Sequence, residues 1–145
     1  MKNVLSLCLI SGLIIFFGFG FQSPKLKIGD KAHGGIIAWI DVSGEHGLVC
    51  AEYDLEMRYK WKEAKTKCHQ LKIGGKDDWY LPSKRELNML YENLHKKGLG
   101  GFVNNYYWSS SDYLNYLAWR QDFSNGYQLN YAKLDAFYVR VVRTF

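Results

Sequence analysis

The sequence predicts a domain of the α+β class, and three observations lead to this prediction. Two strand-like runs lie within residues 34–53, two helix-like runs follow within 61–98, and aromatic or β-branched runs fill 106–142. Strands, then helices, then strands is the order of an α+β fold, since a parallel α/β sheet would require the two types to alternate. We therefore expect an N-terminal β-hairpin, two helices and then several short antiparallel strands.

The first twenty residues have the pattern of an export signal. Lys2 supplies a positive start, and an almost wholly apolar stretch covers residues 4–21. This pattern is typical of a secretory signal peptide, here cleaved after Gly20; the alternative is an uncleaved membrane anchor, since about 17–25 apolar residues can span a bilayer. We expect residues 1–20 to be one of these and 21–145 to form a single domain that is periplasmic, cell-surface or secreted.

The charge balance is moderately basic. The chain has 19 lysine and arginine residues against 14 aspartate and glutamate residues, and without residues 1–20, which contain only Lys2, the excess is +4. Such an excess is compatible with an anionic partner but does not identify one. Nucleic acid is an unsuitable partner for an exported chain with this charge and with its aromatic residues, 17% of the chain, in core-like positions.

Apolar residues recur at helical spacing along one face of the first predicted helix, residues 61–71. These residues are Trp61, Ala64, Cys68 and Leu71. A neighbouring face is basic and continues toward the glycine pair at 74–75, where we expect the helix to end. Its residues are Lys62, Lys65, His69 and Lys72, followed by Lys76.

This basic stripe is the best candidate for an anionic-ligand surface. Sulfates and carboxylates repeat along a polysaccharide, and a row of ammonium groups can meet several of them at once. Each exposed contact contributes only about 0–1 kcal/mol and is screened by salt, so useful affinity requires several copies acting together. The alternative interpretation is an ordinary solvated helix face.

A capping box marks the start of the second helix. Ser83 follows Pro82 and precedes Glu86 by three residues. The Ser83 oxygen can accept a backbone hydrogen bond while Glu86 reaches back to the cap, an arrangement that contributes about 1 kcal/mol. The helix should then turn its leucines toward the core and end at Gly98.

Cys50 and Cys68 allow two interpretations. In an oxidising compartment they can pair as a disulfide, which would stabilise the domain by about 3 kcal/mol in the chain-entropy model. Alternatively, both are small buried apolar side chains, as free cysteines often are.

Several sequence segments together carry a family resemblance. In order, they are GEHGLV at 44–49, DWYLPSKREL at 78–87, YWSSS at 107–111, AW at 118–119 with Phe123 and Gly126, and VRVVRTF at 139–145. With these segments the chain resembles the bacterial DUF1566 family, which includes the C-terminal domain of the Legionella collagen-like adhesin. The resemblance implies an exported domain with a C-type-lectin-like fold. For the adhesin it implies trimerisation and attachment to sulfated glycosaminoglycans, but this chain lacks the collagen-like repeats that would drive a trimer.

Most residues of these signature segments have a structural interpretation, because large aromatic side chains tend to fill cores. The set comprises His46, Trp79, Pro82, Glu86, Trp108, Ser109, Ser110, Trp119, Arg140 and Arg143. We expect the serine run at 109–111 to form a hydrogen-bonded turn rather than to line a polar pocket. We also expect the two arginines to point to one face of the last strand and to pair with carboxylates such as Asp78 or Asp122.

The sequence offers no arrangement for catalysis, a cofactor or a metal ion. Cys68 and His69 are adjacent and diverge on a helix, and no zinc spacing, nucleophile elbow or phosphate loop is present. The Glu-Pro-Asn type of tripeptide that supports calcium-dependent sugar binding is also missing. We therefore expect an exported binding or adhesion domain for an anionic glycan or a surface protein. The alternative is a structural or assembly module of the cell envelope.

Overall fold

The structure, a computed structural model, describes residues 25–145. The expectations for the signal peptide or anchor, residues 1–20, lie outside this range. Between residues 25 and 145, neither helix is long and apolar enough to cross a bilayer.

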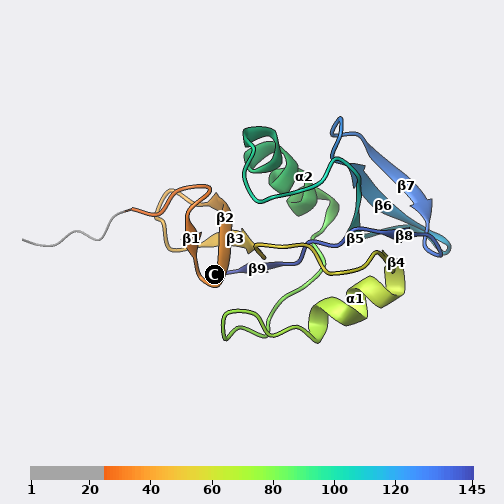
Figure 1. The fold of residues 1–145 in the computed structure, drawn as a ribbon, viewed down its shortest axis with the longest axis horizontal. Helices are drawn as coiled ribbons and strands as arrows, with labels where there is room; N and C mark the ends of the chain where they lie inside the picture. Colours follow the sequence, from red (N-terminus) through yellow and green to blue (C-terminus); the bar gives the residue numbers. More distant parts are fainter. Residues whose placement is uncertain (1–24) are drawn as a thin grey trace, which may run out of the picture.

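The order of elements follows the sequence prediction (Figure 1). A hairpin comes first, two helices follow, and short strands complete the chain. The strands are β1 (Lys31–Ala32), β2 (Gly35–Ile40), β3 (Gly47–Cys50), β4 (Tyr59–Lys60), β5 (Tyr106–Leu114), β6 (Leu117–Asp122), β7 (Gln128–Ala132), β8 (Ala136–Phe137) and β9 (Val142–Thr144). The helices are α1 (Trp61–His69) and α2 (Lys84–Asn93), and α2 leads to a 3₁₀ turn, His95–Lys97.

The strands of these sheets pair antiparallel throughout. One sheet has the order β1-β2-β3-β9, a second pairs β4 with β8, and a third has the order β5-β6-β7. Figure 1 shows the first sheet at one end of the molecule, the third at the other, and the two helices on opposite sides of the strands between them. The α+β class predicted from the sequence is confirmed.

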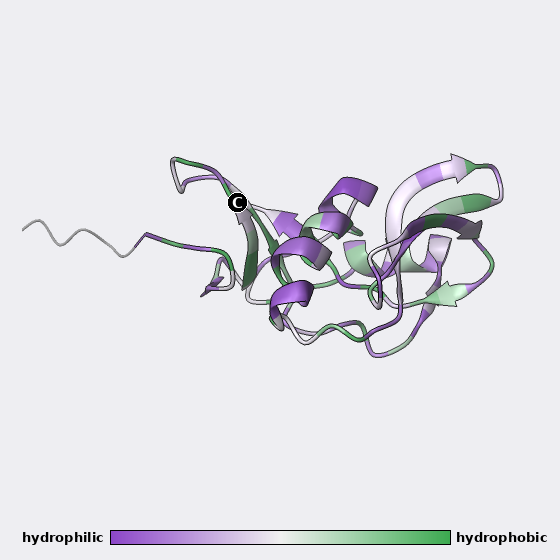
Figure 2. Ribbon diagram, turned by 90° about the horizontal axis from the view of Figure 1, so that it is seen from above, coloured by the Kyte–Doolittle hydropathy of each residue, from purple (hydrophilic) through white to green (hydrophobic). Residues whose placement is uncertain are grey.

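Two hydrophobic clusters lie on the two faces of the four-stranded sheet. Neighbouring residues of a strand point to opposite faces, so Val49 joins the cluster that contains α1, whereas Cys50 joins the one that contains α2. Figure 2 shows hydrophilic ribbon along much of the helices, whereas the strands carry both hydrophobic and hydrophilic stretches.

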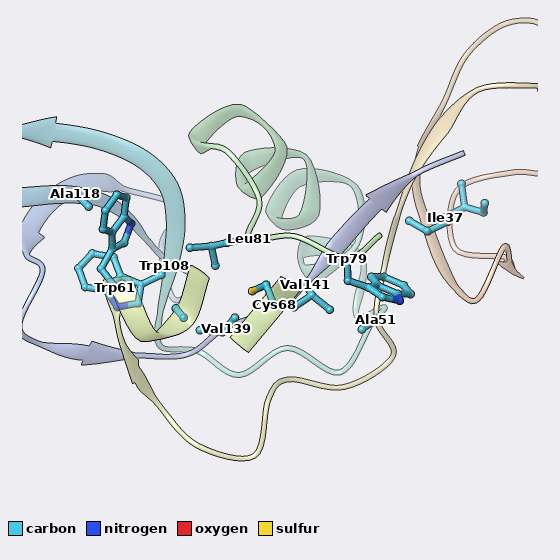
Figure 3. Packing of buried hydrophobic residues seen from close by; sticks show 12 residues of the cluster. Ile37, Ala51, Trp61, Cys68, Trp79, Leu81, Trp108, Ala118, Val139 and Val141 are labelled. Carbon is cyan, nitrogen blue, oxygen red and sulfur yellow. The ribbon is translucent and has the colours of Figure 1, made fainter. Parts of the chain in front are cut away.

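The first cluster connects the two ends of the molecule (Figure 3). It runs from Ile37 on β2 to Ala118 on β6, with Cys68 of α1 near its middle. Trp79 fills one end, while Trp108 and Trp61 pack together at the other. The predicted apolar stripe of the first helix is therefore a core-facing stripe.

The disulfide interpretation is wrong, because Cys50 and Cys68 are both buried free thiols. They belong to different clusters on opposite faces of the sheet. Burial raises the pKa of the Cys50 thiol to about 11 and that of Cys68 to about 12. Both sulfurs therefore stay protonated at neutral pH and act as apolar core groups.

Thiol labelling tests this arrangement. In a Cys8→Ser background, native protein at pH 8 should react with a thiol reagent more slowly than a small free thiol does by several orders of magnitude, because both sulfurs are buried and protonated. After unfolding in guanidinium chloride without reductant, two thiols per chain should react. A count of zero after unfolding would show a disulfide and contradict the structure.

The caps predicted for the second helical segment are present in the structure, whereas the predicted end of the first helix is wrong. Ser83 Oγ accepts from Glu86 N at 3.3 Å and Glu86 Oε2 accepts from Ser83 N at 2.8 Å, so the predicted capping box is confirmed. Gly98 follows in the left-handed region, with φ 69°. The first helix ends at His69, before the expected glycine pair, because those glycines instead form a tight turn between Ile73 and Lys76.

Candidate functional site

The basic stripe predicted on the first helix divides into two parts. Lys62, Lys65 and His69 lie on α1 at helical spacing and share one side of it. Lys72 and Lys76 come after the end of the helix, so the prediction that Lys72 continues the same helical face is wrong. Both are exposed, and Lys76 is positioned by the turn that pairs it with Ile73.

Positive charge is concentrated in this part of the chain. Residues 60–76 contain six lysines and one acidic residue, so their formal charge of +5 equals that of the whole protein. The one acidic residue, Glu63, is occupied as a helix cap, since its Oε2 accepts from Lys60 N at 3.3 Å. No lysine of this segment forms an ion pair with another described residue. The remaining residues carry no formal excess of either sign.

Two shallow hollows border α1. One, of about 260 Å³, is lined by Lys65, His69, Tyr80, Leu81 and Ser110. The other, of about 290 Å³, is lined by Lys62, Glu63, Thr66, Lys67 and Gln70. Both place ammonium groups around a depression that is open to solvent, a geometry that suits an extended anionic chain better than a small enclosed ligand.

An aromatic ring supports the lysines at one end of this surface. Nζ of Lys65 lies 4.7 Å from the centroid of Trp61, and Nζ of Lys133 lies 4.6 Å from it. Lys133 is held in place by an ion pair with Asp112 at 2.6 Å and by the carbonyl of Leu114 at 2.9 Å. Lys133 carries no signal in the sequence, because it lies in the turn after β7 and no local pattern connects it with α1.

Of the signature tryptophans, two are core residues and one is not. Trp79 and Trp108 are buried, and the Trp108 indole donates to the carbonyl of Tyr59 at 2.9 Å. Trp119 is only partly buried, which corrects the expectation that it fills the core. Its ring lies 3.2 Å from Nζ of Lys84 and meets Tyr113 edge-on, so it belongs to a surface cluster.

The serine run is a strand rather than the expected turn. Ser109, Ser110 and Ser111 lie within β5, at an irregularity in its pairing with β6. Ser109 Oγ donates to the Trp119 carbonyl at 2.8 Å, and Ser111 Oγ accepts from Lys84 N at 2.9 Å. These hydroxyls therefore join the strand to its neighbour and to the start of α2. Only Ser110 borders a hollow of the basic surface.

Arg140 is the centre of a buried polar network. Its Nε donates to Asp54 at 2.7 Å and its Nη1 donates to the carbonyl of Gly100 at 2.7 Å. The second carboxylate oxygen of Asp54 accepts from the Tyr107 hydroxyl, also at 2.7 Å. The guanidinium stacks over Phe102, 4.0 Å from its centroid. The Arg140–Asp54 ion pair thus connects three loops. A structural role was expected for Arg140, but its carboxylate partner is Asp54 rather than Asp78 or Asp122.

Arg143 makes a separate pair with Asp78, one of the two carboxylates proposed from the sequence. Nε and Nη2 donate to its two oxygens at 2.6 and 2.8 Å, and Nη1 donates to the carbonyl of His33 at 3.2 Å. The expectation that Arg140 and Arg143 share one face is wrong. A separation of three residues reverses the side-chain direction in an extended chain, and β9 begins only at Val142.

The remaining signature residues make hydrogen bonds that hold the chain around α2 and the hairpin. Glu86 Oε1 accepts from the Tyr80 hydroxyl at 2.7 Å, which connects the capping box to the strand-like segment before it. The Pro82 carbonyl accepts from Ser110 N at 2.7 Å. His46 is exposed at the hairpin turn, where its carbonyl accepts from Asp41 N at 2.9 Å.

The Arg143–Asp78 pair predicts a pH dependence. The hydrogen bond from Arg143 lowers the pKa of Asp78, so the pair stabilises the fold above the unfolded carboxyl value near about 4 and this contribution is lost as the pH falls. Asp78→Asn should therefore lower the urea midpoint at pH 7, and the gap to wild type should narrow at pH 3. Asp77→Asn, which removes a neighbouring exposed carboxylate, is the control. If the difference in urea midpoint between Asp78→Asn and wild type were the same at pH 7 and pH 3, the proposed contribution of the Arg143–Asp78 pair would be contradicted.

A larger hollow of about 660 Å³ lies between the hairpin and the turn after α1. Lys31, Glu52, Tyr53, Leu55 and Ile73 contribute to its lining, and Lys31 pairs with Glu52 at its margin. Neither cysteine lines it. Among residues 25–145, no group of three or more metal-binding side chains comes together.

The histidines do not form a reactive pair with a buried thiol. His33 stacks on Phe145 at 3.8 Å between centroids, and His69 lines the hollow on the basic surface. Both thiols are held protonated by burial, as their raised pKa values indicate. A buried, protonated thiol is a poor nucleophile, so neither cysteine has the reactive form that covalent catalysis requires.

The comparisons with known proteins agree with this architecture. The model of the Lcl C-terminal domain family matches residues 37–143, which cover most of the hairpin, both helices and nearly all of the later strands. The α+β arrangement of the structure fits a lectin-like domain, and the family suggests a surface- or adhesin-associated, exported protein. A search of the curated proteins finds no match. Because the matched segment is most of the sequence, the chain belongs to the Lcl C-terminal domain family.

Proposed function

We propose that this protein is an exported, non-catalytic binding domain that attaches to anionic, sulfated glycans through the basic surface of residues 60–76. One observation carries the proposal: the formal charge of this segment equals that of the whole chain, and its lysines are not neutralised by ion pairs within the described residues. The proposed binding needs no cofactor or metal ion.

The geometry explains why the ligand should be a polymer. The lysines are exposed or half-buried, and Lys62, Lys65 and Lys67 lie at the margins of open hollows. Each contact of such a lysine with a sulfate contributes at most about 1 kcal/mol. Several contacts along one chain, and several domains in one assembly, would be needed for firm attachment. A homo-oligomer, such as the trimer that the resemblance implies, would supply this multivalency.

Retention on immobilised heparin tests the proposal. Replacing Lys62, Lys65 and Lys72 by alanine should weaken heparin binding about tenfold or more, because three contacts of about half a kcal/mol each are lost. The matched control replaces Lys27, Lys96 and Lys97 by alanine, which removes the same charge from exposed positions outside the basic surface. The control should elute close to the wild type.

Equal loss in both triple variants would mean that only net charge matters, and this would contradict a defined surface. Unchanged retention of the Lys62, Lys65 and Lys72 variant would contradict glycan binding by α1. That result would favour the alternative, a structural or assembly module of the cell envelope that contacts other surface proteins.

A further inference from the structure

Arg120, on β6, is a buried arginine that forms no ion pair with any residue in the described part of the chain. The residue is 8% exposed, and its side chain donates no hydrogen bond within residues 25–145. Its Nε is completely buried and unpartnered. The two terminal nitrogens are not among the completely buried unpartnered atoms, so they are the polar groups of this side chain that reach solvent. In contrast, Arg140 and Arg143 each bind a carboxylate.

Three aromatic rings hold the Arg120 guanidinium in place. Its Cζ lies 3.6 Å from the centroid of Tyr106, 4.1 Å from Tyr131 and 4.6 Å from Phe137. The Phe137 ring also meets each tyrosine ring edge-on at 5.6 Å. Such a frame fixes the direction of the side chain and leaves its charge without a counterion, since ring faces attract a cation but do not neutralise it.

Between residues 25 and 145, no carboxylate forms an ion pair with Arg120 from the same face of the sheet. Asp122, two residues further along β6, points to the face that Arg120 occupies. Its oxygens are already used in the next turn, where they accept from Ser124 and Asn125 at 2.6 to 3.1 Å. An external oxyanion would therefore meet a preformed donor pair and would not have to break an internal ion pair.

The surface beside Arg120 is apolar and exposed. Leu129 stands opposite Arg120 on β7 and is 54% exposed, and Tyr131, one of the framing rings, is 43% exposed. The carbon–hydrogen face of a sugar ring packs well against such side chains. This surface is also connected to the basic one, because Phe137 pairs with Tyr59 on β4, next to Lys60 at the start of α1.

We infer that Arg120 and its aromatic frame form an oxyanion subsite that binds a carboxylate or a sulfate carried on a sugar ring. The terminal nitrogens of Arg120 donate to two oxygens of the anion, a paired arrangement that an ammonium group cannot reproduce. Tyr131 and Leu129 contact the ring that carries the anion. The inference rests on the proposed function, of which it specifies one contact beyond the lysine surface.

The test follows the Nε–Hε resonance of Arg120 by NMR in the purified protein during titration with three matched sugars. These are glucuronate, glucose 6-sulfate and glucose, which carry a carboxylate, a sulfate and no charge. The resonance should shift with one or both anionic sugars and not with glucose, and the arm with the larger effect identifies the anion. Arg120→Lys should weaken that binding at least tenfold, whereas Arg85→Lys, a conservative change at an exposed position on α2, should leave it unchanged.

The wild-type titration keeps the test decisive if the Arg120 variant is unstable. No shift with either anionic sugar at 50-fold excess over protein, or an equal shift with glucose, would overturn the subsite. Heparin retention that depends on the α1 lysines, together with an unresponsive Arg120, would overturn this inference and leave the proposed function intact. A response of Arg120 to an anionic sugar in a protein that heparin does not retain would support the subsite and count against the lysine surface.

Discussion

Replacing Arg140 by methionine should lower the free energy of unfolding by about 3–5 kcal/mol, one of the two largest effects expected in this protein. The substitution keeps much of the side-chain volume but leaves Asp54 as an uncompensated charge beside the buried hydroxyl of Tyr107. Removing one partner of a buried pair typically has an effect of this size, because the remaining charge has lost its solvation and its partner.

Urea unfolding measured by fluorescence would give this value. The control is Arg85→Met on the exposed side of α2, which should change the stability by less than about 0.5 kcal/mol. Combining Arg140→Met with Asp54→Asn should recover part of the loss, because the isolated charge is then removed. An Arg140→Met variant as stable as the control would mean that the network does not contribute to stability.

Replacing Trp108 by alanine should have a comparable effect, a loss of about 3–5 kcal/mol. The indole is fully buried, packs against Phe137 at 4.7 Å between centroids, and donates its N–H to the Tyr59 carbonyl. Truncation removes buried apolar surface, leaves a cavity where the first cluster meets the three-stranded sheet, and orphans a carbonyl.

Trp119→Ala is the matched comparison, since it makes the same chemical change on β6 at a partly exposed position. Trp119→Ala should lower the free energy of unfolding by less than half as much as Trp108→Ala. Part of the Trp119 ring already contacts solvent, and water can hydrate the Lys84 ammonium group once the ring is removed. Thermal or urea unfolding of the two variants would give the difference. Equal losses would contradict the division of the signature tryptophans into core and surface.

Local signals predicted much of the fold correctly. The two strand-like runs within residues 34–53 predicted the hairpin, because their signals lie within a few neighbouring residues. The capping box was equally clear, since Ser83 and Glu86 are three residues apart and their hydrogen bonds are local. The apolar stripe of α1 was also found correctly, although the end of the helix was not.

Contacts between distant segments could not be predicted from local pattern. Arg140 and Asp54 are 86 residues apart, and no periodicity connects them. The same holds for Lys133, which reaches the ring of Trp61 from the turn after β7. Whether an aromatic residue is buried depends on which face of which sheet it occupies. This is why Trp108 is buried and Trp119 is only partly buried.

The candidate site was located only in part for the same reason. Lys62, Lys65 and His69 were placed correctly on one side of a helix, because a period of 3.6 residues is a property of the local chain. Arg120 gave no signal, since a single arginine in a strand resembles any other surface arginine. Only the folded arrangement shows that three rings surround it and that no carboxylate of the described residues meets it.

The central claim is that the aromatic and arginine residues of the signature segments build the scaffold, while the lysine-rich segment at 60–76 binds the ligand. Mapping amide chemical shifts of the ¹⁵N-labelled protein during titration with a heparin-derived hexasaccharide tests it most directly. We expect the largest changes in residues 60–76 and smaller ones around Arg120. Changes centred on the hollow beside Lys31 and Glu52, with residues 60–76 unaffected, would contradict the account.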